Sequence, residues 1–271
     1  MLNITKDCYS IFFKYYRDRF EEVEKGLVEV KEKCEVLTKL KKKFAHSMWV
    51  VDNVEWICEN ENIPLDIRKM CEVAALFHDI GRFDQTIKFN SFDDSNTLDH
   101  AELSGQILLS FKGQLLHHAE EYELEIIYKA ICTHNKKEVS FASGSTIKVV
   151  SNVLSDANKL QILDVNFKNN MFQTKDSRYS GDGVIKQECI DEFKRRRVLD
   201  NSIVDTVLEN RIKCASWIFD MKYASSKRKM IDEGYMDILL STDKISNKDV
   251  VSAIKKIQAE VEEYIKLHLI G

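Results

Sequence analysis

The side chains best suited to chemistry lie together in the segment AALFHDIGRF, residues 74–83. The adjacent pair His78 and Asp79 follows an apolar run, and Gly81 and Arg82 come soon after the pair. Burying an imidazole and a carboxylate without partners is costly, because each loses its hydrogen bonds to water. A divalent metal ion would offset this cost. The segment therefore predicts part of a metal site whose other ligands come from elsewhere in the chain.

Other histidine and aspartate residues in apolar company can supply those ligands. His46 lies inside a long amphipathic pattern, His134 ends a second, and Asp156 is surrounded by apolar residues in a third. His100 stands at the start of a further predicted helix. Imidazole nitrogens and carboxylate oxygens suit borderline or hard divalent ions, and several helices of a bundle can bring them to one point. We expect one or two divalent ions, with Mn, Fe, Co, Ni, Mg and Zn not distinguished.

Helical periodicity along most of the chain provides the elements that must position these residues. The sequence has one proline and nine glycines, and its apolar residues recur at steps of three and four. The expected helices cover about residues 7–20, 20–60, 65–78, 100–111, 120–134 and 146–164, with three or four more from about 184 to the end.

The junctions between these helices are also predicted. The long helix of residues 20–60 is expected to break near Lys41–Lys43. Gly81 is expected to end the preceding helix in a backbone conformation that other residues disfavour. Residues 84–98 are polar and aperiodic, which indicates an ordered loop over the site, and Asp99 can cap the helix that starts at His100.

The whole chain is predicted to be one all-α domain, residues 1–271. A helical core occupies about residues 40–165, and a C-terminal helical cover occupies about residues 184–271. The stretch 166–183 is polar and irregular, and the composition does not shift at any linker.

Composition narrows the class of protein. The chain is 44% hydrophobic and 31% charged, with a net charge of -4, so neither a nucleic acid nor a membrane surface is expected as a partner. The basic clusters Lys39–Lys43 and Lys194–Arg197 are expected to be solvated helix faces. Seven scattered cysteines without a C-x-x-C motif favour reduced thiols. With no leader-like or membrane-spanning stretch, these features predict a cytoplasmic protein.

The order of the ligands, H…HD…D, resembles the HD-domain superfamily of metal-dependent phosphohydrolases. The resemblance rests on His46, the doublet His78-Asp79 and Asp156, and it covers about residues 40–165. Its strongest pieces are FHDIGRF and SDANKLQILD. The SDANKLQILD segment is similar to the family's DADKLD signature, with Asn158 in place of the later aspartate of DAD.

The resemblance implies a ligand set for a first metal ion, namely His46, His78, Asp79 and Asp156. His100 and His134 match the two additional histidines of the branches that hold two ions. In those branches the aspartate of the doublet, here Asp79, bridges the ions and orients the water or hydroxide that acts as the nucleophile. A bound metal ion makes such a nucleophile available because it lowers the pKa of water toward neutrality.

Arg82 is expected to lie at the rim of the site. Its planar fork of donors suits a phosphate clamp, and HD-GYP phosphodiesterases carry a lysine at the matching place in HDIGK. The alternative is a simple ion pair with Asp84 or Asp93. In (p)ppGpp hydrolases two acids follow the HD pair, and here those places hold Arg82 and Phe83, which argues against that activity.

Lys159 is the other candidate for substrate binding. It lies three residues after Asp156, so it can neutralise a substrate phosphate or pair with that aspartate, and the sequence favours neither. Several aromatic residues could stack on a base, although packing in the core is the expected role for Phe83, Phe89, Phe92 and Tyr179.

The predicted function is hydrolysis of a phosphomonoester or phosphodiester in a nucleotide or another small phosphorylated metabolite, by a metal-activated hydroxide. The set H…HD…H…H…D also resembles the myo-inositol oxygenase branch of HD proteins, which are di-iron enzymes. Arg82 and the DANKL segment favour hydrolysis over oxygenation. A third alternative is a non-catalytic nucleotide-binding module, against which the complete ligand set argues.

Overall fold

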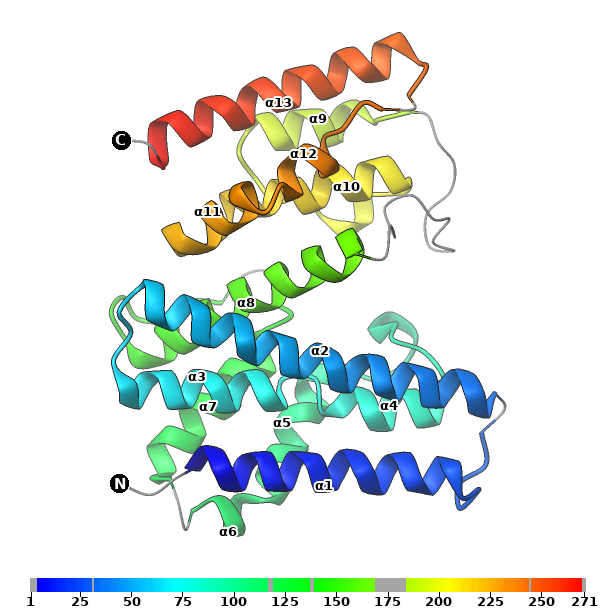
Figure 1. Cartoon of the computed structure of the whole chain (residues 1–271), viewed down its shortest axis with the longest axis vertical. Coiled ribbons are helices and arrows are strands. Elements are labelled where there is room, and N and C mark those ends of the chain that lie inside the picture. The colour runs from blue at the N-terminus through cyan, green and yellow to red at the C-terminus, as the bar shows by residue number, and fades with distance from the viewer. Residues whose placement is uncertain are drawn as a thin grey trace. The chain divides into compact units, whose positions relative to one another are not determined.

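The protein is helical throughout the part that the computed structural model describes. That part comprises residues 4–30, 32–116, 119–136, 139–168, 184–243 and 245–269, and it contains helices and no strand (Figure 1). The all-α prediction is confirmed. The chain forms two compact units, Met1–Asn158 and Lys159–Gly271, while the grouping of residues 1–271 into one domain stays a prediction. None of the described helices combines the length and the apolar character that crossing a membrane requires.

The first unit contains the helices that carry the predicted ligands. Its elements are α1 (Ile4–Glu24), α2 (Lys33–Asn60), α3 (Leu65–Phe77), α4 (Gly81–Phe89), the 3-10 turn η1 (Asp94–Asn96), α5 (His100–Ser110), α6 (Lys112–Leu115), α7 (Glu121–Thr133) and the first part of α8 (Thr146–Lys168). α2 and α3 lie side by side, and α3 also packs against α7 (Figure 1).

The helix expected over residues 20–60 is interrupted at a different place from the one predicted. α1 ends at Glu24 and α2 begins at Lys33, whereas Lys41–Lys43 lie inside α2. Gly26 adopts a φ of 70° in the connecting turn, a conformation that costs glycine little because it has no Cβ. The prediction was wrong because Val23, Leu27 and Val30 continue the apolar spacing through this turn.

An aromatic cluster holds both sides of the His78-Asp79 pair. Phe12 of α1 is fully buried. Its ring centroid lies 6.0 Å from that of Phe77, just before the pair, and 5.9 Å from that of Phe83, just after it. Such edge and tilted contacts are favourable in addition to the apolar area that they bury. α1 therefore fixes the path of the chain on either side of the two polar residues.

Gly81 has a steric role, and the predicted left-handed helix end is wrong. α3 ends at Phe77, α4 begins at Gly81, and Gly81 is not among the residues with positive φ. A Cβ at position 81 would lie 2.8 Å from both the carbonyl oxygen of His100 and the amide nitrogen of Ser104. The Gly81 amide also donates to Ser104 Oγ at 2.9 Å. The missing side chain therefore lets the start of α4 approach the first turn of α5.

The segment 84–98 is only partly the loop that was expected. Residues 84–89 belong to α4, and Asn90, which follows its last residue, adopts a left-handed φ of 49°. The rest is tied to α4 by Gln85, whose Nε2 donates to Thr97 Oγ1 at 2.7 Å and to the Leu98 carbonyl at 2.9 Å. The predicted cap is confirmed, because the Asp99 side chain accepts from two backbone amides of the first turn of α5.

The second unit is a helical assembly with its own core. After the end of α8 it contains α9 (Gln187–Lys194), η3 (Asn201–Ile203), α10 (Val207–Ser216), η4 (Trp217–Phe219), α11 (Ala224–Asp232), α12 (Tyr235–Leu239) and α13 (Lys248–His268). Glu209 of α10 is fully buried and accepts from the backbone amides of Lys186, Asp205 and Thr206. From residue 184 onward the described part contains five α-helices, where three or four were expected. α8 continues to Lys168, so residues 166–168 of the stretch expected to be irregular are helical, and its residues 169–183, with Tyr179, lie outside the described part.

We expect Gly81→Ala to lower the free energy of unfolding by about 1–3 kcal/mol, the usual range for overpacking a tight contact. The added methyl would press on backbone atoms of α5, which cannot rotate away as a side chain can. Gly113→Ala is the matched control, because a Cβ at that position of α6 meets nothing within 4 Å. Urea unfolding followed by circular dichroism measures both. Equal stability of the two variants would contradict this account of Gly81.

Candidate metal centre

Two groups of potential metal ligands share one carboxylate. His46, His78 and Asp79 form the first group, and Asp79, His100 and His134 form the second, with the ligand atoms of each group within 4.8 Å of one another. The residues come from α2, from the turn after α3, from the start of α5 and from the residue that follows α7. The fold thus brings together five of the six residues predicted as ligands.

Asp79 lies between two pairs of imidazoles. Its Oδ2 is 3.3 Å from His46 Nε2 and 3.7 Å from His78 Nε2. Its Oδ1 is 3.3 Å from His100 Nε2 and 3.8 Å from His134 Nε2. Each oxygen therefore faces its own pair of nitrogen atoms, which is the arrangement that a carboxylate bridging two ions would need.

Hydrogen bonds on the far side of the rings determine which nitrogen faces Asp79. His78 Nδ1 donates to the Ala75 carbonyl at 2.6 Å, and His134 Nδ1 donates to the Ile131 carbonyl at 2.7 Å. A carbonyl oxygen can only accept, so in each neutral ring the proton is on Nδ1 and the lone pair is on Nε2. A lone pair on Nε2 is what a metal ligand must offer.

The two histidines of the second group face each other with their Nε2 atoms. His100 Nδ1 lies 2.6 Å from Asp94 Oδ2, a carboxylate oxygen that accepts, so in the neutral ring the lone pair is on Nε2. His100 Nε2 and His134 Nε2 are 3.0 Å apart. When both rings are neutral, two lone pairs face each other at this distance and repel. The donor set therefore fits a divalent cation.

The protonation states also fit metal binding. Burial lowers the pKa of His78 well below its ordinary value and lowers the pKa of His134 to about 4. Burial alone would raise the pKa of Asp79, but Lys43 and the surrounding imidazoles hold it well below its usual range. At neutral pH His78 and His134 are therefore neutral and the carboxylate is ionised, as metal ligands must be.

Lys43 is a member of the site that the sequence did not reveal. Its Nζ lies 2.7 Å from Asp79 Oδ2, and it sits over the Phe92 ring at 5.0 Å from the centroid. The sequence indicated a solvated face for the basic cluster that contains it. One available signal was its spacing, because residues three apart share a helix face and Lys43 precedes His46 by three.

Arg82 pairs with a different carboxylate from those considered. The residue is 9% exposed, and its Nη1 donates to Asp94 Oδ1 at 2.7 Å, to the Phe92 carbonyl at 2.7 Å and to Gln85 Oε1 at 2.6 Å. The predicted alternative partner Asp84 instead accepts a hydrogen bond from Tyr15 Oη at 2.6 Å.

The other edge of the Arg82 guanidinium faces the second group. Its Nη2 is 3.4 Å from His100 Nε2, and its Nε is 3.8 Å from Asp79 Oδ1. The Nε is buried and has no hydrogen-bond partner. A buried donor without a partner is costly, so this edge has an N–H available for a ligand.

Asp156 and Lys159 lie on α8. Asp156 is fully buried but belongs to neither group that contains Asp79. The carbonyl of the next residue, Ala157, accepts from Asn53 Nδ2 of α2 at 3.2 Å, so this part of α8 packs on the helix that carries His46. Lys159 Nζ lies 2.5 Å from Asp220 Oδ2, a partner that the sequence did not indicate. Metal binding by Asp156 and substrate binding by Lys159 stay predictions.

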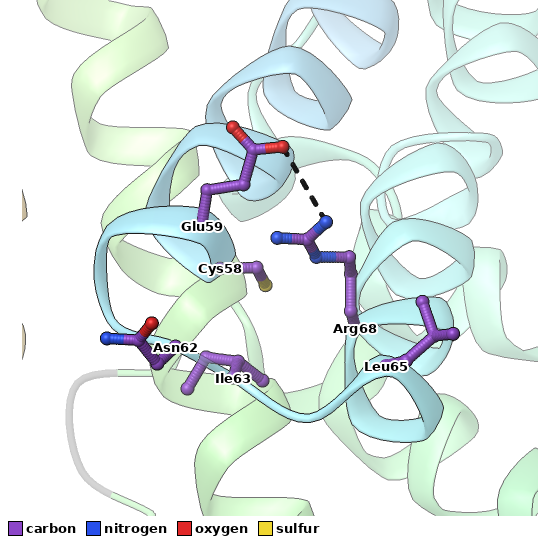
Figure 2. Close-up of a pocket in the computed structure, with 6 residues that line it drawn as sticks. All are labelled: Cys58, Glu59, Asn62, Ile63, Leu65 and Arg68. Atoms are coloured by element: carbon purple, nitrogen blue, oxygen red, sulfur yellow. Dashed lines mark ion pairs between the residues drawn. The ribbon is translucent and has the colours of Figure 1, made fainter.

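A surface pocket of about 380 Å³ lies at the turn between α2 and α3 and contains none of these residues. It is lined by Cys58, Glu59, Asn62, Ile63, Leu65 and Arg68 (Figure 2). Figure 2 shows the Arg68 side chain directed toward Glu59, and Arg68 Nη1 lies 3.6 Å from Glu59 Oε1. The pocket is therefore distinct from the metal-ligand groups.

Comparison with known proteins agrees with the geometry. Residues 44–163 match the family model of the HD domain. This range includes His46, the doublet His78-Asp79, His100, His134 and Asp156. Searches of curated proteins and of solved structures found no match. HD domains are in general metal-dependent hydrolases of small phosphorylated substrates, and the histidine and aspartate groups described above are compatible with that role. Residues 44–163 of the chain therefore form an HD domain, and this part belongs to the HD-domain superfamily.

Proposed function

We propose that this protein is a metal-dependent phosphohydrolase that cleaves a phosphomonoester or phosphodiester of a nucleotide or another small phosphorylated metabolite. The observation that carries the proposal is the position of Asp79. Its two oxygens face two pairs of imidazole Nε2 atoms, each within 3.8 Å. This arrangement suits two divalent ions that share one carboxylate.

Each group of ligands has its own place in the proposal. His46, His78 and Asp79 would hold one ion, with Asp156 as the further ligand that the family resemblance implies. His100, His134 and Asp79 would hold the other. When bound, the ions supply what side chains lack, a hydroxide at neutral pH and charge to stabilise phosphoryl oxygens.

The remaining residues bind and orient. Lys43 and the imidazoles around Asp79 keep its carboxylate ionised, so it can accept a hydrogen bond from a water and orient it. Arg82 is fixed by Asp94, Gln85 and the Phe92 carbonyl. Its Nε–H edge therefore presents donors without further loss of side-chain entropy. Such charge-assisted donors suit the oxygens of a phosphate.

The cysteines are in keeping with a cytoplasmic protein. All seven are free thiols in the structure. Free, mostly buried thiols are typical of a reducing compartment. We therefore propose that the protein acts in the cytoplasm on a small diffusible substrate, without a membrane or nucleic-acid partner.

Binding of Mn²⁺ or Co²⁺ should stabilise the metal-free protein, because the ions bind the folded ligand set and not the unfolded chain. At a free ion concentration of about 100 times Kd, we expect the free energy of unfolding to rise by about 2.7 kcal/mol, which corresponds to a Tm increase of roughly 5–10 °C. A chelator should reverse it. Asp79→Asn, which alters the ligand shared by both groups, should abolish the Tm increase. Asp52→Asn, at an exposed acid of α2, should retain it. Differential scanning calorimetry measures each case, and a full shift in Asp79→Asn would exclude Asp79 as the shared ligand.

The protein loaded with Mn²⁺ or Co²⁺ should release phosphate, or cleave a diester, in a panel of nucleotides and phosphorylated metabolites. The double variant His78→Ala with Asp79→Ala should fall to the background rate of the metal solution, because it removes ligands from both groups. Undiminished hydrolysis in the double variant would sink the proposed mechanism. Iron-dependent oxygen uptake without phosphate release would favour the oxygenase alternative.

Arg82→Lys should lower kcat/KM by roughly 10–100-fold, since charge-assisted hydrogen bonds contribute about 1.5–3 kcal/mol. Lysine keeps the charge but loses the planar fork. Arg68→Lys, at the arginine of the α2–α3 pocket, is the control and should keep the kinetics of the wild type. Steady-state kinetics on the best substrate of the panel provides the measurement. A kcat/KM within twofold of the wild type would exclude the clamp.

A further inference from the structure

His100 differs from the other oriented histidines in its place on its helix. His78 and His134 each follow the last residue of a helix, and the Nδ1 of each ring donates to the carbonyl three residues earlier. His100 is the first residue of α5. No helical carbonyl precedes it, so its ring needs a partner from elsewhere to fix its orientation.

Asp94, in the 3-10 turn η1, provides that partner. Its Oδ2 lies 2.6 Å from His100 Nδ1. Because an ionised carboxylate only accepts, the ring must carry its proton on Nδ1. In the neutral ring the lone pair is then on Nε2, which lies 3.3 Å from Asp79 Oδ1 and 3.0 Å from His134 Nε2. The position of one carboxylate thus decides whether His100 can act as a ligand.

Asp94 is itself held from α4. Its Oδ1 accepts from Arg82 Nη1 at 2.7 Å and from Gln85 Nε2 at 3.0 Å, and Gln85 is fully buried. Burial alone would raise the pKa of Asp94, but the hydrogen bonds from His100 and Gln85 and the charge of Arg82 lower it to about 2. The carboxylate is therefore ionised wherever the protein is folded near neutral pH. Each of its oxygens has a different partner.

We propose that Asp94 is the positioning residue of the group formed by Asp79, His100 and His134. It fixes the ring and the tautomer of His100, and it joins this ligand to the Arg82 guanidinium. The inference uses the proposed function only in that it takes this group to bind a divalent ion. Partners of this kind, one hydrogen bond beyond the metal, orient the ligating histidine and strengthen its nitrogen as a donor.

Metal binding provides the first test, by calorimetric titration of the metal-free protein with Co²⁺ and by the visible absorption of the bound ion. The Co²⁺-binding step that is lost or weakened in His134→Gln is the step that belongs to the group of Asp79, His100 and His134. We expect Asp94→Ala to weaken the same step by about 10–100-fold, the usual effect of losing such a partner. Asp94→Asn, which keeps an acceptor for Nδ1–H but not the charge, should be intermediate. Asp93→Ala, at the exposed neighbouring acid, should bind as the wild type does.

The tautomer of His100 provides a further test that needs no metal and no substrate. Long-range ¹H–¹⁵N spectra of the metal-free protein distinguish a ring protonated on Nδ1 from one protonated on Nε2. We expect the Nδ1–H form in the wild type and in Asp93→Ala. In Asp94→Ala we expect a substantial fraction of the Nε2–H form, because that proton then relieves the repulsion from His134.

The outcomes separate this inference from the proposed function. Wild-type Co²⁺ affinity together with an unchanged tautomer in Asp94→Ala would overturn the role of Asp94, whatever the activity. Weakened binding in Asp94→Ala, with no hydrolysis of any substrate by the wild type, would support Asp94 and remove the phosphohydrolase. If Asp94→Ala melts below the assay temperature, Asp94→Asn decides. Wild-type Co²⁺ affinity in that variant would count against the inference, and a partial loss of affinity would support it.

Discussion

The buried negative charge of Asp79 is the constraint on which the rest of this site depends. The carboxylate is 3% exposed, and an unpaired carboxylate at that depth would be strongly unfavourable. Its Oδ2 contacts Lys43, and imidazoles approach both of its oxygens. The partners come from α2, α5 and α7, so the helices must converge on this one residue. The charge that makes the site costly in isolation is also what would attract metal ions.

The orientation of the ligands follows from where each one stands on its helix. At the ends of α3 and α7 the chain still offers helical carbonyls, and these hold His78 and His134 by their Nδ1 atoms. At the start of a helix no such carbonyl exists, and a side chain must replace it, as Asp94 does for His100. The close approach that brings α5 to this position depends on the missing Cβ of Gly81. Helix ends and one glycine thus determine the geometry of the site.

The sequence predicted those parts of the protein that depend on local pattern. Helical periodicity indicated the all-α class, and apolar surroundings marked His46 and His134 as residues that point inward. The sequence did not identify Lys43 or Asp94. Lys43 lies in an ordinary basic helix face and Asp94 in an ordinary polar loop, and neither pattern indicates that the side chain has a buried partner. Their roles arise only when α2, α4 and α5 pack together. The break at Gly26 was missed for the opposite reason, since the apolar spacing continues where the helix does not.

The charge around the two groups bears on the kind of molecule that the site accepts. Lys43 and Arg82 already balance the carboxylates of Asp79 and Asp94 through the contacts described. Any divalent ion that binds then adds positive charge, and Asp156, a further buried acid of the HD domain, can offset only part of what two ions bring. Opposite charges attract strongly where water is scarce, so two bound ions would favour an anionic ligand. A phosphate ester meets that requirement, and a neutral polyol does not. Arg82 would add to this attraction, since its Nη1 is paired with Asp94 while its buried Nε has no hydrogen-bond partner within the protein.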